Sequence, residues 1–83
     1  MTSFGSYYRP MREYTVILDP DLEGRGFTVT VPALSGCITE GRTREESVAN
    51  AREAILLYLE SLLADGEPIL EDPPQAEVLK VVV

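Results

Sequence analysis

Two side chains in one short loop could act as nucleophiles. Ser35 and Cys37, the only cysteine, lie two positions apart in the stretch VPALSGCITEG at residues 31–41. Nucleophiles of this kind need a neighbouring base, most often a histidine, and the sequence contains no histidine. The single lysine, Lys80, could serve a serine instead, but it lies in a predicted strand and its spacing does not support a pair. We therefore predict that Cys37 is a small buried packing residue and that the chain has no catalytic residue.

Carboxylates cluster just upstream, in the segment DPDLEG at residues 19–24. Asp19, Asp21 and Glu23 have the spacing of a calcium loop, but Thr30 occupies the position where such a loop requires a bidentate carboxylate. A magnesium-dependent nuclease site would instead need carboxylates that converge from separate elements. An adjacent run of carboxylates on a turn is typical of a solvated hairpin connection, so we expect no metal and no other cofactor.

The charge balance bears on what the chain could bind. Its 83 residues include 14 acidic and 7 basic side chains, which gives a formal net charge of -7. Binding to phosphates requires a surplus of cations, so direct nucleic-acid binding is disfavoured, whereas an acidic surface attracts basic partners. Plain solubility would explain the same charge. No stretch has the apolar length of a signal peptide or a membrane span, so we expect a cytoplasmic protein without a membrane partner.

Three short strands are predicted in the first half of the chain. The β-branched and aromatic run at 12–18 predicts the first strand, and strict alternation at 27–31 predicts the second. The inward-facing side chains of the second strand are Phe27, Val29 and Val31. A third strand at 37–40 follows a turn at Ser35-Gly36. Because the first two strands flank a connection rich in Pro and Gly, they should form a hairpin.

One long helix is the strongest local prediction. Thr43 and Glu46 have the spacing of a capping box, with Thr43 as the N-cap and Glu46 reaching back to it. The helix should run from Arg44 to Ala64 and end before Gly66. The residues spaced for one apolar stripe are Val48, Ala51, Ile55, Leu59, Leu62 and Leu63.

The opposite face of this helix carries a leucine among charged side chains. Glu53, Leu57 and Glu60 lie there at helical spacing. We predict that these residues bind a partner, with the two carboxylates steering the encounter and Leu57 touching the other chain. The simpler alternative is that Leu57 is an ordinary exposed leucine.

The chain closes with a predicted strand, VLKVVV at 78–83, after an acidic, proline-rich connector at 66–77. A strand that follows a helical crossover predicts parallel pairing with a right-handed connection. The fold class is then α+β in the order β-β-β-α-β, with one long helix packed on a small mixed sheet. One helix covers only one face of the sheet, and Ile17 together with alternate residues of 78–83 should make the other face apolar. We therefore expect self-association or a dedicated partner at this face, and of these a homodimer.

These residues together resemble the HicB-type antitoxin domain. The resemblance runs from Gly26-Phe27 through the VPALSGCITEG corner to the helix start, and covers about residues 13–83. The helix start contributes TREES at 43–47 and NAREA at 50–54. Within the motif we predict structural roles, at places where a strand ends or the chain doubles back or enters the helix, for Pro32, Gly36, Gly41, Thr43 and Glu46.

Residues 1–11 mix Gly, Ser, Pro and two tyrosines without a clear period, which predicts a flexible tail before a single domain at 12–83. For this domain the resemblance implies a partial ribonuclease-H-like fold without nuclease activity. It also implies binding and neutralisation of a small, basic, RNA-cleaving toxin of the HicA type. Many members carry a C-terminal DNA-binding segment, whereas this sequence ends at Val83 after the predicted strand. We therefore expect no direct contact with nucleic acid. Two alternatives remain open: a small homo-oligomeric protein of another role, and a degenerate metal-dependent nuclease that uses Asp19 or Asp21.

Overall fold

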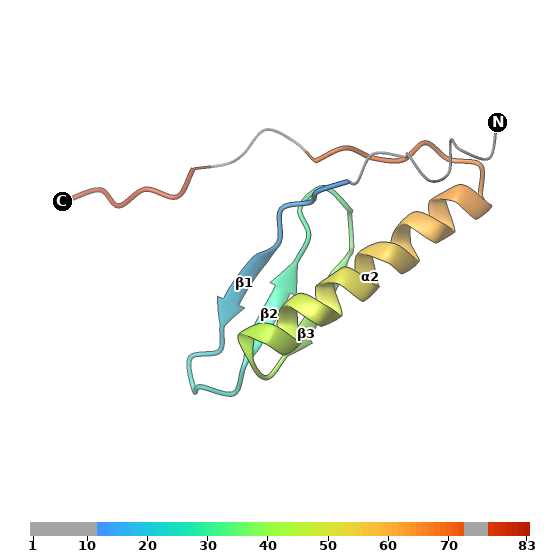
Figure 1. Cartoon of the computed structure of the whole chain (residues 1–83). Helices are drawn as coiled ribbons and strands as arrows, with labels where there is room; N and C mark the ends of the chain where they lie inside the picture. Colours follow the sequence, from blue (N-terminus) through green and yellow to red (C-terminus); the bar gives the residue numbers. More distant parts are fainter. Residues whose placement is uncertain (1–11, 73–76) are drawn as a thin grey trace.

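The computed structural model describes residues 12–72 and 77–83, so the predicted tail at 1–11 lies outside the described residues. Three strands form one antiparallel sheet in the order β1-β2-β3. A single helix follows them and lies along one face of this sheet, as Figure 1 shows. The elements are β1 (Ile17–Pro20), β2 (Phe27–Thr30), β3 (Ile38–Gly41) and α2 (Arg44–Ala64). This arrangement confirms the α+β fold class.

The register of the strands decides which side chains face the helix. Leu18 is paired with Val29, and Val29 with Thr39. Residues paired across neighbouring strands lie on the same face of a sheet, and side chains alternate along each strand. Val29 is fully buried, so this row faces α2 and the predicted alternation of the second strand is confirmed. The row that faces away consists of Ile17, Thr30 and Ile38.

The first and third strands begin later than predicted. Pairing with β2 starts only at Ile17, so the described segment 12–16 is not part of the sheet. The cause is that β2 itself ends at Thr30, just before Pro32 turns the chain. The third strand starts after Cys37, because the backbone of this residue is hydrogen-bonded within the corner.

The hydrophobic core is centred on the corner between β2 and β3. Val31, Leu34 and Cys37 are buried, with exposed fractions of 1%, 1% and 6%. The Leu34 N–H donates to the Val31 carbonyl (3.0 Å), and the Cys37 N–H donates to the Leu34 carbonyl (2.9 Å). The Val31 N–H in turn donates to the Cys37 carbonyl (3.1 Å). These bonds pair amides that would otherwise be costly to bury, and Cys37 is the packing residue that the sequence predicts.

Helix α2 covers this core with an apolar stripe that is rotated from the predicted one. Its residues that are buried or packed against the core are Ser47, Ala51, Ala54, Ile55, Tyr58 and Leu59. The prediction is correct at Ala51, Ile55 and Leu59. It is wrong at Val48 and Leu63, whose exposed fractions are 47% and 58%.

The rotation follows from a close approach between α2 and β3. A Cβ atom placed on Gly41 would lie 2.4 Å from Ser47 Oγ and 2.6 Å from Ser47 Cα. The absence of a side chain at this position lets the helix come against the strand there. The small Ser47, rather than the neighbouring Val48, therefore turns toward the sheet.

Both ends of α2 are capped. Thr43 Oγ1 accepts a hydrogen bond from the Glu46 N–H (3.0 Å), so Thr43 is the N-cap. The Glu46 carboxylate accepts from the N–H of Arg42 (2.5 Å), one residue before the amide that a capping box predicts. At the other end Gly66 has a φ of 71°. There a Schellman motif forms through two bonds, from the Gly66 N–H to the Leu63 carbonyl and from the Glu67 N–H to the Leu62 carbonyl.

The strand predicted at 78–83 is not formed. After α2 the chain returns to the start of the domain, where the N–H and hydroxyl of Thr15 donate to the Asp72 carboxylate at 2.9 and 2.7 Å. Residues 77–83 carry no secondary structure and are exposed. In the described residues the sheet is therefore antiparallel rather than mixed, and the order is β-β-β-α rather than β-β-β-α-β. A strand needs a sheet edge at the right register, and this contact does not bring 78–83 to one.

Candidate partner-binding surface

The two candidate nucleophiles of the corner do not form a reactive pair. Cys37 is buried, and this burial raises the pKa of its thiol, which stays protonated at neutral pH. Ser35 lies on the exposed side of the corner, where its carbonyl accepts a hydrogen bond from the Tyr58 hydroxyl (2.9 Å). Lys80 lies in the exposed segment 77–83. The corner is therefore a structural unit that α2 holds through Tyr58.

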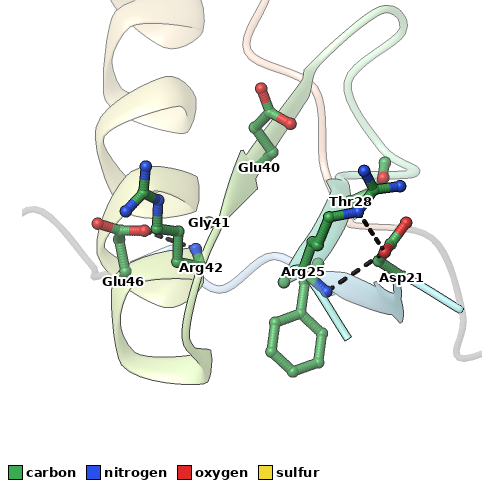
Figure 2. A pocket seen from close by; sticks show the side chains of 9 residues that line it. Asp21, Arg25, Thr28, Glu40, Gly41, Arg42 and Glu46 are labelled. Carbon is green, nitrogen blue, oxygen red and sulfur yellow. Dashed lines mark hydrogen bonds and ion pairs between the residues drawn. The ribbon is translucent and has the colours of Figure 1, made fainter. Parts of the chain in front are cut away.

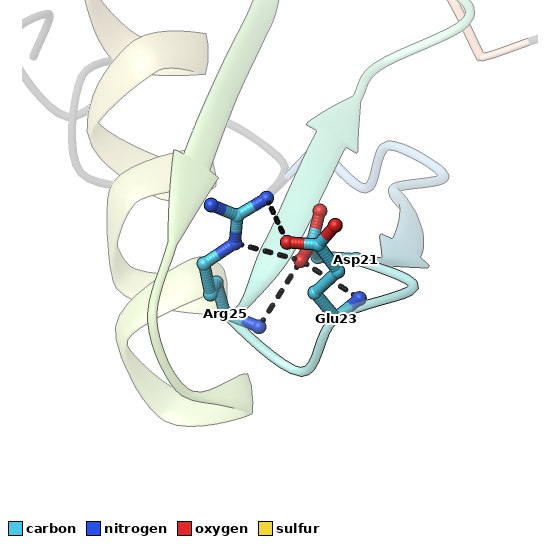
Figure 3. A network of polar contacts seen from close by, with 3 residues as sticks. All are labelled: Asp21, Glu23 and Arg25. Carbon is cyan, nitrogen blue, oxygen red and sulfur yellow. Dashed lines mark hydrogen bonds and ion pairs between the residues drawn. The ribbon is translucent and has the colours of Figure 1, made fainter.

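The carboxylates at 19–24 organise the turn between β1 and β2 (Figure 3). Asp21 Oδ2 accepts hydrogen bonds from the Glu23 N–H (3.0 Å) and from the backbone N–H and Nε of Arg25 (3.3 and 3.2 Å). Arg25 also forms an ion pair with Glu23 (2.7 Å). The Arg25 side chain, followed by the Arg25 amide, holds the pKa of Asp21 below its ordinary value. The predicted hairpin connection is confirmed.

Within the described residues 12–72 and 77–83, the structure contains neither a metal-binding cluster nor a membrane-spanning helix. In these ranges no three His, Cys, Asp or Glu side chains are grouped so that they could hold a metal ion. Within the same ranges, the structure contains no helix with the length and apolar character needed to cross a membrane. Asp21 and Glu23, two of the carboxylates that suggested a metal site, stabilise the turn, and the spacing of Asp21 and Arg25 was the sequence signal for that role.

An open hollow of about 450 Å³ lies between this turn and the start of α2 (Figure 2). Its charged lining residues are Asp21, Arg25, Glu40, Arg42 and Glu46. Two of these carboxylates already accept hydrogen bonds from the walls of the hollow, Asp21 from Arg25 and Glu46 from the Arg42 amide. Because its charges are mixed and partly paired with one another, we assign no ligand to the hollow.

Glycines shape the walls of the hollow and the corner. A Cβ atom on Gly26, where φ is 118°, would lie 2.3 Å from the Gly41 carbonyl oxygen. Gly41 was predicted to have a structural role and Gly26 was not, although a glycine directly before the aromatic Phe27 was an available signal. Of the other predicted structural residues, Gly36 has a φ of 79° within the corner, and Pro32 is exposed directly after β2.

The three predicted partner-binding residues lie together on the outer side of α2. Glu53, Leu57 and Glu60 are separated by about one helical turn each and are all exposed. Leu57 has an exposed fraction of 61%, and the nearby Leu56 and Leu63 have 56% and 58%. We call Leu56, Leu57 and Leu63 the outer leucine patch. Leu63 was predicted in the buried stripe, and Leu56 was not among the predicted partner-binding residues.

The face of the sheet away from α2 carries a second group of apolar side chains. Ile17 and Ile38 flank Thr30 across the three strands and are 44% and 62% exposed. The next row on the same face is Asp19, Thr28 and Glu40. The apolar character predicted for this face is therefore present in the two isoleucines. Its expected contribution from 78–83 is missing.

Most of the chain matches a known protein family. The matching family is described as the HicB_like antitoxin of bacterial toxin-antitoxin system, and it aligns with residues 14–81, which include the sheet, the corner and all of α2. The chain belongs to the HicB-like antitoxin family. Membership supports an antitoxin role for this HicB-like domain and is consistent with a protein that has no enzymatic activity.

Several relatives of this HicB-like antitoxin carry the name UPF0150 protein. One from Synechocystis is 40% identical over 70 residues, which cover 84% of this chain and 87% of the relative. One from Thermoplasma acidophilum is 47% identical over 60 residues, covering 72% of this chain and 86% of the relative. One from Helicobacter pylori is 48% identical over 40 residues, covering 48% of this chain and 56% of the relative.

Proposed function

We propose that this HicB-like antitoxin binds and neutralises a small, basic, RNA-cleaving toxin of the HicA type in the cytoplasm, acts there as a homodimer, and performs no catalysis itself. The family match over residues 14–81 supports the proposal. The observation that carries it is the outer leucine patch, which presents exposed apolar side chains beside two carboxylates on α2.

The outer leucine patch has the composition of a protein-binding surface. Leu57 lies between Glu53 and Glu60 along α2 and is already exposed, so a partner can bury it without rearranging the helix. Burying one leucine side chain contributes about 1.5–3 kcal/mol. The two carboxylates add negative charge where a basic partner makes first contact, and the net charge of -7 acts in the same direction.

The test is inhibition of a HicA-type ribonuclease, sought beside the gene for this chain. RNA cleavage is measured while purified wild-type antitoxin is added, and we expect cleavage to stop at stoichiometric amounts. Leu57→Asp should weaken binding at least about tenfold, because a carboxylate would be buried in place of an apolar contact. Full toxin activity in the presence of the wild-type chain would overturn the function. Unchanged inhibition by Leu57→Asp would overturn the assignment of α2.

Two control variants separate the apolar and electrostatic parts of the proposal. Leu22→Asp changes a fully exposed leucine in the turn between β1 and β2, away from the outer leucine patch, and should inhibit like the wild type. Combined Glu53→Lys and Glu60→Lys should slow association several-fold at low salt and less at high salt, because salt screens exposed charges. An unchanged association rate in this double variant would remove the electrostatic part.

A second copy of the chain is the other partner that an observation favours. Ile17 and Ile38 remain exposed on the sheet face that α2 does not cover. Light scattering of the purified chain tests the homodimer, for which we expect twice the chain mass of 9.2 kDa. A mass of 9.2 kDa at every concentration would contradict the homodimer and leave the toxin proposal intact.

A further inference from the structure

Strand β3 has one edge that no strand covers. It lies at one end of the sheet order, beside β2 alone, and within the described residues 12–72 and 77–83 no strand pairs with its outer side. An edge strand presents backbone donors and acceptors that can pair with a strand of another molecule. Proteins that recognise an extended segment of a partner often do so by adding it to such an edge.

The register shows which backbone groups of β3 face this edge. The Val31 N–H donates to the Cys37 carbonyl at 3.1 Å, which makes these residues a hydrogen-bonded pair. The next pair along the two strands is Thr30 with Ile38. In an antiparallel ladder, hydrogen-bonded pairs alternate with pairs whose N–H and carbonyl groups point to the other side of each strand. The backbone groups of Ile38 and, two residues later, of Glu40 therefore face the outer edge.

Helix α2 runs beside β3 in the opposite direction and extends over this edge. Ser47 lies against Gly41, and three residues later the Asn50 Nδ2 group donates to the Glu40 carbonyl at 2.7 Å. Each step forward along α2 thus corresponds to a step back along β3. Because the Glu40 carbonyl faces the outer edge, the side of α2 that carries Asn50 lies above that edge.

Leu57 lies on the same side of α2 as Asn50. The seven residues between their positions correspond to almost two full helical turns, so the two side chains point in nearly the same direction. Leu57 is 61% exposed, and Ile38 is 62% exposed on the opposite face of the sheet. The side chains of a strand added to β3 would alternate between these two faces and bury both residues. The Leu57 side of the outer leucine patch is therefore continuous with the edge of β3.

The carboxylates around the edge favour a basic strand. Glu53 lies one turn before Leu57 on α2, and the Glu40 side chain lies on the other face of the sheet, in the same row as Thr28. Neither Glu40 nor Glu53 forms an ion pair with another residue of 12–72 or 77–83. Opposite charges on neighbouring strands stabilise their pairing. A strand with lysine or arginine side chains on both faces meets a carboxylate on each side.

A second copy of this chain does not fit the same edge. Symmetric pairing of two β3 strands is antiparallel and places both α2 helices on one face of the joined sheet. Paired strands lie about 4.8 Å apart, whereas packed helices need about 8–10 Å between their axes. Since each α2 extends over the shared edge, the two helices would overlap. The edge therefore suits a strand that carries no helix above it.

We propose that the small basic toxin adds a strand to the outer edge of β3, beside Leu57. The backbone hydrogen bonds at Ile38 and the apolar contact at Leu57 then belong to one interface. This inference rests on the proposed function, because it names the way in which the same partner is held.

Ile38→Pro tests the backbone contact. Because the Ile38 N–H faces outward, a proline there removes a donor from the edge and none from the ladder with β2. Ile38→Thr is the matched control, since it loses the same side chain and keeps the N–H. Isothermal titration with the ribonuclease of the inhibition assay measures binding. We expect a dissociation constant at least about tenfold higher for Ile38→Pro than for Ile38→Thr, with matching circular dichroism of the two free variants.

Amide hydrogen exchange of the wild-type chain gives a second readout that needs no variant. In the free chain the Ile38 and Glu40 amides should exchange at least about tenfold faster than the Thr39 amide, which is bonded to β2. Binding of the ribonuclease should slow exchange at Ile38 and Glu40 by about tenfold or more, because an added strand pairs these amides. If Ile38→Pro does not fold, this measurement alone decides.

The possible outcomes separate the two proposals. A wild-type chain that does not bind the ribonuclease overturns the proposed function and strand addition with it. Binding that is equally strong in Ile38→Pro and Ile38→Thr overturns strand addition alone, and so does exchange at Ile38 and Glu40 that the ribonuclease leaves unchanged. Exchange at these two amides that slows with rising concentration of the chain alone would place a second copy at the edge and overturn the choice of occupant.

Discussion

The corner at 31–37 and the C-terminal arm at 77–83 have similar apolar character and opposite surroundings. In the corner Leu34 is 1% exposed, whereas in the arm Val82 is 96% exposed. The corner closes its backbone hydrogen bonds within itself and lies under α2, while the arm has no strand or helix of its own chain against it in the described residues. Apolar composition alone therefore does not decide burial. A segment also needs partners for its amides.

The largest expected effect tests this difference directly. Leu34→Ala should lower the free energy of unfolding by about 2–5 kcal/mol, because it leaves a cavity in the core. Val82→Ala should change that free energy by less than about 0.5 kcal/mol when the chain is dilute enough to be monomeric. Urea denaturation of both variants measures the contrast. Equal losses of unfolding free energy in the two variants would contradict the difference in burial between the corner and the arm.

The next effect concerns the helix that covers the corner. Gly41→Ala should lower the free energy of unfolding by about 1–3 kcal/mol, because the new Cβ would overlap Ser47. Adding Ser47→Ala should not relieve the loss, since Ser47 Cα and N both lie 2.6 Å from the new atom and belong to the backbone. Thermal denaturation of the single and double variants measures whether Ser47→Ala relieves the loss of stability. Recovery in the double variant would show that only the Ser47 hydroxyl restricts the approach.

A smaller effect on stability is expected from the hydrogen bond between Tyr58 and Ser35 at the corner. It can be compared with the hydrogen bond between Tyr14 and Leu70, which lies on the way to the arm. Tyr58→Phe removes a hydrogen bond to the Ser35 carbonyl and should cost about 0.5–1.5 kcal/mol. Amide hydrogen exchange at Leu34 and Cys37 should become faster in this variant. Tyr14→Phe, which removes the bond to Leu70, is the matched control and should leave those two amides unchanged. Faster exchange at both amides in Tyr14→Phe would show that the two regions are coupled.

The smallest effect belongs to the turn at Asp21, which closes its hydrogen bonds as the corner does but stays exposed. Because Arg25 lowers the pKa of Asp21 in the folded chain, the stabilisation is present above the ordinary value of 3.8 and is lost as pH falls through the folded pKa. Asp21→Asn should therefore be less stable than the wild type near neutral pH. The difference should shrink in acid. Denaturation curves at several pH values that differ by a constant amount would contradict this assignment.

Sequence reasoning succeeded where the cause of a structure lies within a few residues. The N-cap at Thr43, the end of α2 before Gly66 and the alternation around Val29 all depend on local spacing. It failed at Val48, because the orientation of α2 depends on Gly41 in another element. It also failed for the strand at 78–83, because pairing requires an edge in register, which no local pattern specifies.

The candidate partner-binding surface also has a part that local spacing predicts and a part that depends on tertiary structure. Helical periodicity placed Glu53, Leu57 and Glu60 on one exposed face, and no geometry was needed for that. The outer leucine patch became visible only after Leu63 was found to be exposed, since its exposure follows from the rotation of the helix. The partner-binding role of these residues and the boundary between tail and domain at residue 12 stay predictions.

The contact between Thr15 and Asp72 also bears on the order in which parts of the chain close during synthesis. It joins residues 57 positions apart, so it closes after the local contacts of the hairpins and the helix, which cost less chain entropy. A nascent chain thus completes its core before Asp72 is fixed beside Thr15.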